Sequence, residues 1–122
     1  MKRTVVIVED DRWLNDSYAR IIRSGGYEVY TAADGDEAIE AIDEYKPDLI
    51  LLDVLLRRTT GMALLHELQS HVDLAGIPIV IISSMAKRLE PSELKPYGIR
   101  AVLDKETTTP EDMLRTVKEA LG

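Results

Sequence analysis

The stretch Val5-Val6-Ile7-Val8-Glu9-Asp10-Asp11 decides the fold: four apolar residues, three of them valine, run directly into three acids. A continuous β-branched run of this kind is typical of a strand that helices cover on both faces, as in a parallel sheet. Similar runs occur at 49–52, directly before Asp53, and at 79–82, directly before Ser83. These three segments predict the central strands of a parallel sheet, each followed by a polar side chain.

Two weaker runs and a set of helical patterns complete an alternating order. The runs at 29–32 and 101–103 are shorter or more mixed, which suits strands nearer the edges of the sheet. Thr109, Pro110 and Asp112 predict a capped start for the last helix, with a capping box. Apolar residues recur with the helical period in four segments: 14–22, 38–45, 62–68 and 113–121.

The segment between the fourth and fifth runs is the exception. Residues 87–98 contain Pro91 and Pro96, and a proline inside a helix removes a hydrogen bond and clashes with the preceding turn. We therefore expect a short or displaced helix that begins near Pro91. The whole pattern predicts an α/β protein of five β-α units, with a parallel sheet and right-handed crossovers, in which residues 1–122 form one domain.

The composition excludes several classes of function. The chain has a net charge of −7, which disfavours binding to nucleic acid or to an anionic membrane surface. It has no cysteine, and so no disulfide, thiolate metal site or thiol nucleophile. No apolar run approaches the roughly 20 residues of a membrane span, and the apolar run near Met1 is too short for a signal peptide. We therefore expect a cytoplasmic domain.

Open parallel sheets carry their sites at the carboxyl ends of the strands. Like-charged carboxylates about 4 Å apart cost on the order of 4 kcal/mol per pair at an effective dielectric of about 20, so either one takes up a proton or a cation lies among them. Oxygen ligands without a nearby His or Cys favour Mg²⁺ over Zn²⁺. A hydroxyl, a lysine and Mg²⁺ around an aspartate would hold a phosphoryl group, and the aspartate can be its acceptor. The residues at the predicted strand ends are Glu9, Asp10, Asp53, Ser83 and Lys105.

In this order, the strand-end residues resemble those of a receiver domain of two-component response regulators. The resemblance rests on the acidic pair Glu9-Asp10 and on Asp53, Ser83 and Lys105, and it extends over essentially the whole chain. It implies a flavodoxin-like fold, a three-layer sandwich around a parallel sheet of order 2-1-3-4-5. It also implies a regulatory phosphoacceptor rather than an enzyme. The partners would be a histidine kinase or a histidine phosphotransfer protein and a downstream protein.

The resemblance gives each of the acidic residues a role. Asp53 would accept the phosphoryl group from a phosphohistidine. Asp10, Asp53 and the backbone carbonyl of Leu55 would bind Mg²⁺ directly, and Glu9 would act through water. Asp11 is left with an electrostatic part only.

The resemblance also implies how the phosphoryl group would be held and lost. Ser83 would donate a hydrogen bond to one phosphoryl oxygen and shift on phosphorylation, and Lys105 would pair with another. Leu55 and Met85, two residues beyond Asp53 and Ser83, occupy positions that govern water access in the family. Both side chains are apolar and cannot orient an attacking water. We therefore expect slow autodephosphorylation.

Three positions depart from the family pattern. Arg57 and Val102 stand where a proline and an aromatic residue are usual, and Glu106 replaces the usual proline after Lys105. A valine cannot perform the inward rotation of the aromatic ring. We expect a trans bond before Glu106, because a cis bond costs about 2.5–4 kcal/mol at a non-proline residue. Arg57 and Arg58 suggest an acidic partner surface or partial neutralisation of the phosphorylated site.

These departures leave an alternative open, in which the chain is a pseudo-receiver that acts as a constitutive protein-interaction domain. A phosphatase of the haloacid dehalogenase type is less well supported, since that family needs Asp-x-Asp after the first strand, where this chain has Glu9-Asp10-Asp11. A monomer and a weak dimer both agree with the sequence. His66 and His71 are predicted to face solvent, and Trp13, off the apolar stripe, is predicted to be half exposed or to cover a neighbouring loop.

Overall fold

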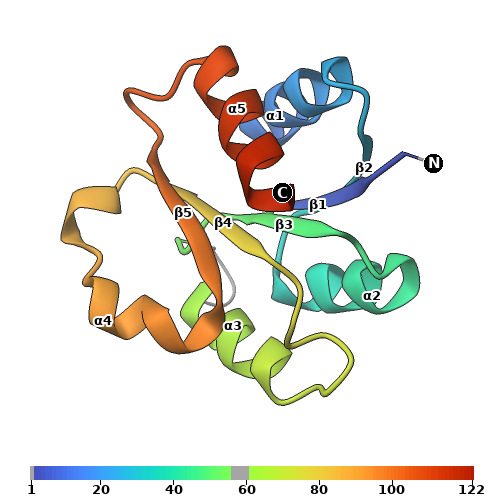
Figure 1. Cartoon of the computed structure of the whole chain (residues 1–122), viewed down its shortest axis with the longest axis vertical. Helices are drawn as coiled ribbons and strands as arrows, with labels where there is room; N and C mark the ends of the chain where they lie inside the picture. Colours follow the sequence, from blue (N-terminus) through green and yellow to red (C-terminus); the bar gives the residue numbers. More distant parts are fainter. Residues whose placement is uncertain (1, 56–60) are drawn as a thin grey trace.

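In the computed structural model, which describes residues 2–55 and 61–122, the five predicted strands form one parallel sheet (Figure 1). Their order is β2-β1-β3-β4-β5, which confirms the flavodoxin-like prediction and leaves β2 and β5 at the edges. The strands are β1 (Thr4–Val8), β2 (Glu28–Ala32), β3 (Leu49–Leu52), β4 (Ile79–Ser83) and β5 (Ile99–Asp104).

Helices cover both faces of the sheet and make the outer two layers of the sandwich (Figure 1). On one face lie α1 (Arg12–Ser24) and α5 (Pro110–Leu121), and on the other lie α2 (Gly35–Tyr45) and α3 (Gly61–Gln69). Successive side chains of the central strands enter two separate cores, because strand residues alternate between the faces. The core under α1 and α5 takes Val5, Ile7, Leu49, Leu51, Val80 and Ile82, and the core under α2 and α3 takes Val6, Val8, Ile50, Leu52, Ile79 and Ile81.

The segment before β5 is irregular, as its prolines predict. A 3₁₀ turn, η1 (Ala86–Arg88), is followed by the single-turn helix α4 (Pro91–Leu94) and by a second 3₁₀ turn, η2 (Lys95–Tyr97). Pro91 occupies the first turn of α4, where its missing N–H leaves no helical hydrogen bond unmade. The predicted short helix that begins near Pro91 is confirmed.

Side-chain caps place the helix starts close to the strand ends. Thr109 Oγ1 accepts from Asp112 N and Asp112 Oδ2 accepts from Thr109 N, both at 3.1 Å, so the predicted capping box of α5 is confirmed. Asp11 Oδ1 accepts from Leu14 N at 3.0 Å and caps α1. Asp34 caps α2 in the same way. Asp11 therefore caps a helix, which corrects the prediction that its part is electrostatic only.

Two further predictions can be compared with the backbone. The peptide bond before Glu106 is trans, as predicted, since the described residues contain no cis bond. Within residues 2–55 and 61–122, every helix is too short or too polar to span a bilayer. The predictions made for Arg57 and Arg58 lie outside the described residues.

Candidate functional site

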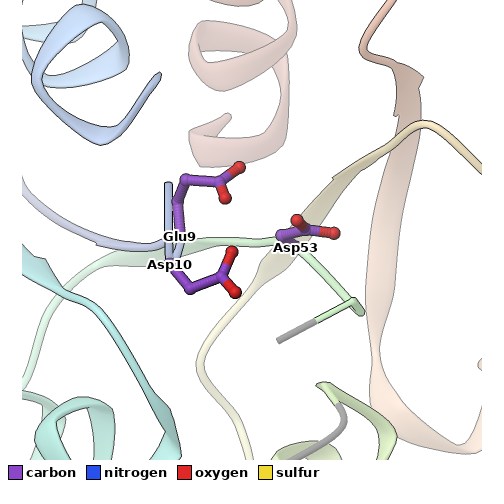
Figure 2. Close-up of side chains that lie close together, drawn as sticks. All are labelled: Glu9, Asp10 and Asp53. Carbon is purple, nitrogen blue, oxygen red and sulfur yellow. The ribbon is translucent and has the colours of Figure 1, made fainter. Parts of the chain in front are cut away.

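Neighbouring strands bring the three predicted acids together at the carboxyl edge of the sheet. Glu9 and Asp10 follow β1, Asp53 follows β3, and these two strands are paired. One carboxylate oxygen from each of the three residues lies within 4.8 Å of the others. Figure 2 shows the three side chains grouped beside the end of β3. The acids expected from the sequence to share one site therefore do so.

Lys105, directly after β5, supplies a positive charge to this cluster. Its Nζ lies 2.6 Å from Glu9 Oε1 and 2.8 Å from Asp53 Oδ2. The side chains of Glu9 and Asp53 are 1% and 3% exposed, and that of Lys105 is 17% exposed. Three ionised carboxylates against one ammonium group leave two negative charges. The cluster is therefore short of positive charge.

The pKa values of the charged groups follow from burial and from these contacts. Burial raises the pKa of Glu9, and the charge of Asp53 adds to this, while the contact with Lys105 and the N–H of Asp11 act in the opposite direction. Burial alone would lower the pKa of Lys105, but the hydrogen bonds and charges of Asp53 and Glu9 outweigh it, and that pKa is raised. Lys105 is therefore held as an ammonium group.

Backbone N–H groups fix the direction of both buried carboxylates. Leu55 N donates to Asp53 Oδ1 at 2.9 Å, and Asp11 N donates to Glu9 Oε2 at 3.0 Å. The other oxygen of each carboxylate faces Lys105. Asp53 is thus held by a hydrogen bond at each oxygen, and Glu9 by a hydrogen bond at Oε2 and an ion pair at Oε1.

Ser83 lies at the end of β4 and is fully buried. Its Oγ accepts a hydrogen bond from Met85 N at 3.0 Å, which leaves the hydroxyl proton to be donated elsewhere. Lys105 N donates to Ser83 O at 3.2 Å, so the backbone links the two residues. The hydroxyl, the ammonium group and the acids therefore all lie at one edge of the sheet, as the sequence predicts.

This arrangement at the strand ends agrees with a comparison of the sequence with known families. Residues 5–118 match the family model of the response regulator receiver domain. The chain belongs to this family. The receiver is 29% identical over 122 residues to the polar-differentiation response regulator DivK of Brucella anthropi, in an alignment that covers 100% of this chain and 98% of DivK.

Solved structures show the same likeness. The receiver matches the chemotaxis response regulator CheY4 of Vibrio cholerae with a TM-score of 0.88 and 26% identity, over 98% of this chain and 99% of that chain. It also matches a putative response regulator from Chloroflexus aurantiacus with a TM-score of 0.85 and 28% identity. This match covers 99% of this chain and 98% of that chain. Receivers are regulatory modules of two-component signalling that interact with histidine kinases or phosphotransfer proteins, and this chain is one of them.

Asn15 is a site residue that sequence reasoning missed. It is 6% exposed, and its Nδ2 donates to Glu9 O at 2.9 Å and to Ala32 O at 3.1 Å. The amide therefore ties α1 of the receiver to the ends of β1 and β2. The signal in the sequence was a polar residue on the apolar stripe that contains Tyr18 and Ile22.

The structure also shows the surroundings of His66, His71 and Trp13, whose exposure was predicted from the sequence. His66 is exposed, as predicted, but its Nε2 lies 2.8 Å from Tyr97 Oη and so joins α3 to η2. His71 is exposed, as predicted. Trp13 is 76% exposed, more than either predicted alternative, because it lies in the first turn of α1 away from the buried stripe.

The face of the receiver around β5 carries the predicted departure from the family. Val102 is 37% exposed and lines a hollow of about 550 Å³ together with residues of η1, α4 and β5. The position where the resemblance implies an aromatic side chain therefore borders a hollow in this chain.

Proposed function

We propose that this receiver accepts a phosphoryl group on Asp53 from a phosphohistidine of a histidine kinase or a phosphotransfer protein, in a reaction that depends on Mg²⁺. Residues 1–122 would act as one receiver domain. The supporting observation is the sharing of Lys105 between Glu9 and Asp53, with Asp10 completing the acidic cluster. An O–P bond would form to a carboxylate oxygen of Asp53 while the N–P bond breaks, and the histidine nitrogen would keep the electron pair.

The residues of the acidic cluster fit Mg²⁺. Carboxylate oxygens are the ligands that this ion prefers, and the cluster supplies one from each of three residues within 4.8 Å. Asp10, Asp53 and the carbonyl of Leu55 would hold the ion, with Glu9 acting through water. Bound Mg²⁺ would supply the positive charge that the cluster lacks and would offset the charge of the phosphoryl oxygens.

Lys105 and Ser83 would hold the transferred group. Lys105 already donates to one oxygen of Asp53, so it can turn to a phosphoryl oxygen bound at that carboxylate. The hydroxyl of Ser83 would donate its remaining proton to a second phosphoryl oxygen, since its Oγ already accepts from Met85 N. A shift of Ser83 would carry the change along β4 toward the face around Val102. Leu55 is exposed and Met85 is partly buried. Because neither apolar side chain can orient an attacking water, the loss of phosphate would be slow.

Labelling with acetyl phosphate tests the proposal. The receiver is incubated with acetyl phosphate and Mg²⁺, and its intact mass is measured. We expect the mass of one added phosphoryl group, lost with a chelator and lost in Asp53→Asn. Asp11→Asn is the matched control, because Asp11 is exposed and caps α1, and it should still be labelled. An unlabelled wild-type protein would contradict the proposal and favour the pseudo-receiver.

A further inference from the structure

The free edge of β2 forms a groove beside α1. β2 pairs with β1 alone and lies at the edge of the sheet (Figure 1). Two hollows, of about 530 and 400 Å³, follow this edge, and both are lined by Asp16 and Thr31. Because they share these residues, the hollows form one groove with Thr31 near its middle.

The hydrogen bonds of β2 show which residues face the groove. Glu28 N donates to Arg3 O, and Ala32 O accepts from Glu9 N, so the even-numbered residues from 28 to 32 point toward β1. The N–H and C=O of one strand residue point to the same side, and successive residues alternate. The residues that present backbone groups to the groove are therefore Val29, Thr31 and Ala33.

Two charged side chains of the receiver already occupy the ends of this edge. Arg23 Nη2 donates to Val29 O at 3.0 Å, and Glu37 Oε2 accepts from Ala33 N at 3.1 Å. Between them, the backbone N–H and C=O of Thr31 have no partner among the residues that the structure describes. The edge thus carries a positive side chain at one end, a negative one at the other, and an open peptide unit between them.

We propose that this edge is a homodimer interface, in which the β2 strands of two receivers pair antiparallel around a two-fold axis at Thr31. In this register, Thr31 of each copy exchanges both backbone hydrogen bonds with Thr31 of the other. Val29 of one copy then faces Ala33 of the other. The interface joins the two sheets into one.

The charges of the edge select a second copy as the occupant. Antiparallel pairing sets Arg23 of one copy beside Glu37 of the other, and the symmetry repeats this pair. Arg23 then releases Val29 O, and Glu37 releases Ala33 N. In the dimer, Ala33 N of one copy donates to Val29 O of the other. Every backbone hydrogen bond that is given up is therefore replaced, and the two ends of the edge attract rather than repel.

The outer face of α1 forms the other wall of the groove. Asp16 and Arg20 both line the groove, with Asp16 toward the acidic site and Arg20 one turn further along the helix. Because the contact involves one short strand and part of one helix from each copy, the dimer is weak and forms at high protein concentration.

Sedimentation equilibrium of charge-reversed variants tests the interface. We expect the wild-type receiver to dimerise at concentrations up to about 1 mM, the range in which small interfaces are populated. Arg23→Glu and Glu37→Arg should each raise the dimer dissociation constant by about tenfold or more, because the pair occurs twice and turns repulsive. The double variant R23E/E37R should restore dimerisation. Arg115→Glu, on α5, is the matched control and should dimerise like the wild type.

Two further measurements separate a loss of dimerisation from a loss of folding. Thermal melts show whether each variant is folded, and the amide signal of Thr31 in NMR spectra should move with wild-type concentration. A wild-type protein that stays monomeric, a double variant that does not recover, or amide shifts confined to α4 and β5 would overturn the proposal. The pairing needs no phosphoryl group on Asp53, so sedimentation of the unphosphorylated receiver and labelling with acetyl phosphate test the two proposals separately.

Discussion

Replacing Lys105 with methionine removes the ammonium group that Glu9 and Asp53 share, while keeping most of the side chain's apolar stem. Removing one partner of a buried ion pair costs about 3–5 kcal/mol, because a buried charge loses its compensation. The side chain of Lys105 is 17% exposed, so water replaces part of that compensation. We therefore expect the free energy of unfolding to fall by about 2–4 kcal/mol at about pH 7.5 without Mg²⁺.

The size of this loss depends on pH, because Glu9 can take up a proton. Burial already raises the pKa of Glu9 and Lys105 lowers it, so the substitution raises that pKa further. A carboxyl group whose pKa is raised in the folded state stabilises it most below the unfolded pKa, and this stabilisation is lost as pH rises through the folded pKa. The deficit of Lys105→Met should therefore be largest at neutral pH and shrink as pH falls toward 4.5, the ordinary value for Glu9.

Urea unfolding at about pH 7.5 and about pH 5, with a chelator or with Mg²⁺, measures this deficit. Mg²⁺ should narrow this difference at neutral pH, since the proposed ion would supply positive charge to the cluster that has lost Lys105 and would stabilise the variant more than the wild type. Lys46→Met is the matched control: Lys46 Nζ also lies 2.9 Å from two carboxylates, of Asp43 and Asp73, but its side chain is 50% exposed. Exposed ion pairs contribute little to stability, so Lys46→Met should lower the free energy of unfolding much less than Lys105→Met does. The reasoning would be refuted if Lys46→Met lowered the free energy of unfolding as much as Lys105→Met, or if the loss in Lys105→Met did not change with pH.

Three further predictions concern phosphate loss and packing. Leu55→Asn and Met85→Glu should each speed the loss of phosphate from the labelled receiver, because a polar side chain can orient water; intact mass over time checks this, and unchanged rates would contradict it. Gly61→Ala should lower the free energy of unfolding by about 1–3 kcal/mol, because a Cβ there would clash with the backbone of Val54; an unchanged urea midpoint would contradict this. Tyr97→Phe should cost about 1 kcal/mol by removing the hydroxyl bonded to a histidine of α3, and an equal melting curve would count against that bond.

Much of the fold was predictable because its local signals agree with its packing. The continuous apolar runs at 5–8, 49–52 and 79–82 became strands buried on both faces. The capping box at Thr109 formed as expected, and Pro91 began the short α4. Each of these features depends on residues close together in the sequence, so none of them required knowledge of the tertiary structure.

The position of the site was predictable for a different reason. A parallel sheet brings the ends of its strands to one edge, so Asp53, Ser83 and Lys105 had to lie near the acids after β1. The direction of each side chain was not predictable. That Lys105 contacts Glu9 as well as Asp53 depends on how Glu9 turns after β1. The roles of these residues in phosphotransfer stay predictions.

The contacts that sequence reasoning missed join segments far apart in the chain. Asn15 appears in the sequence as a defect in an apolar stripe, and only the neighbouring ends of β1 and β2 give its amide two acceptors. Likewise, the bond between Tyr97 and His66 needs η2 to lie against α3. Such polar contacts follow from tertiary packing and leave no periodic pattern in the sequence.

The most direct test of the central claim locates the phosphoryl group. The receiver is labelled with acetyl phosphate and Mg²⁺, reduced with borohydride, which converts an aspartyl phosphate to homoserine, and digested for sequencing by mass spectrometry. Our account predicts homoserine at position 53 and unmodified aspartate at Asp10 and Asp11. Homoserine at either of those positions, or an unmodified Asp53 in a labelled sample, would contradict it.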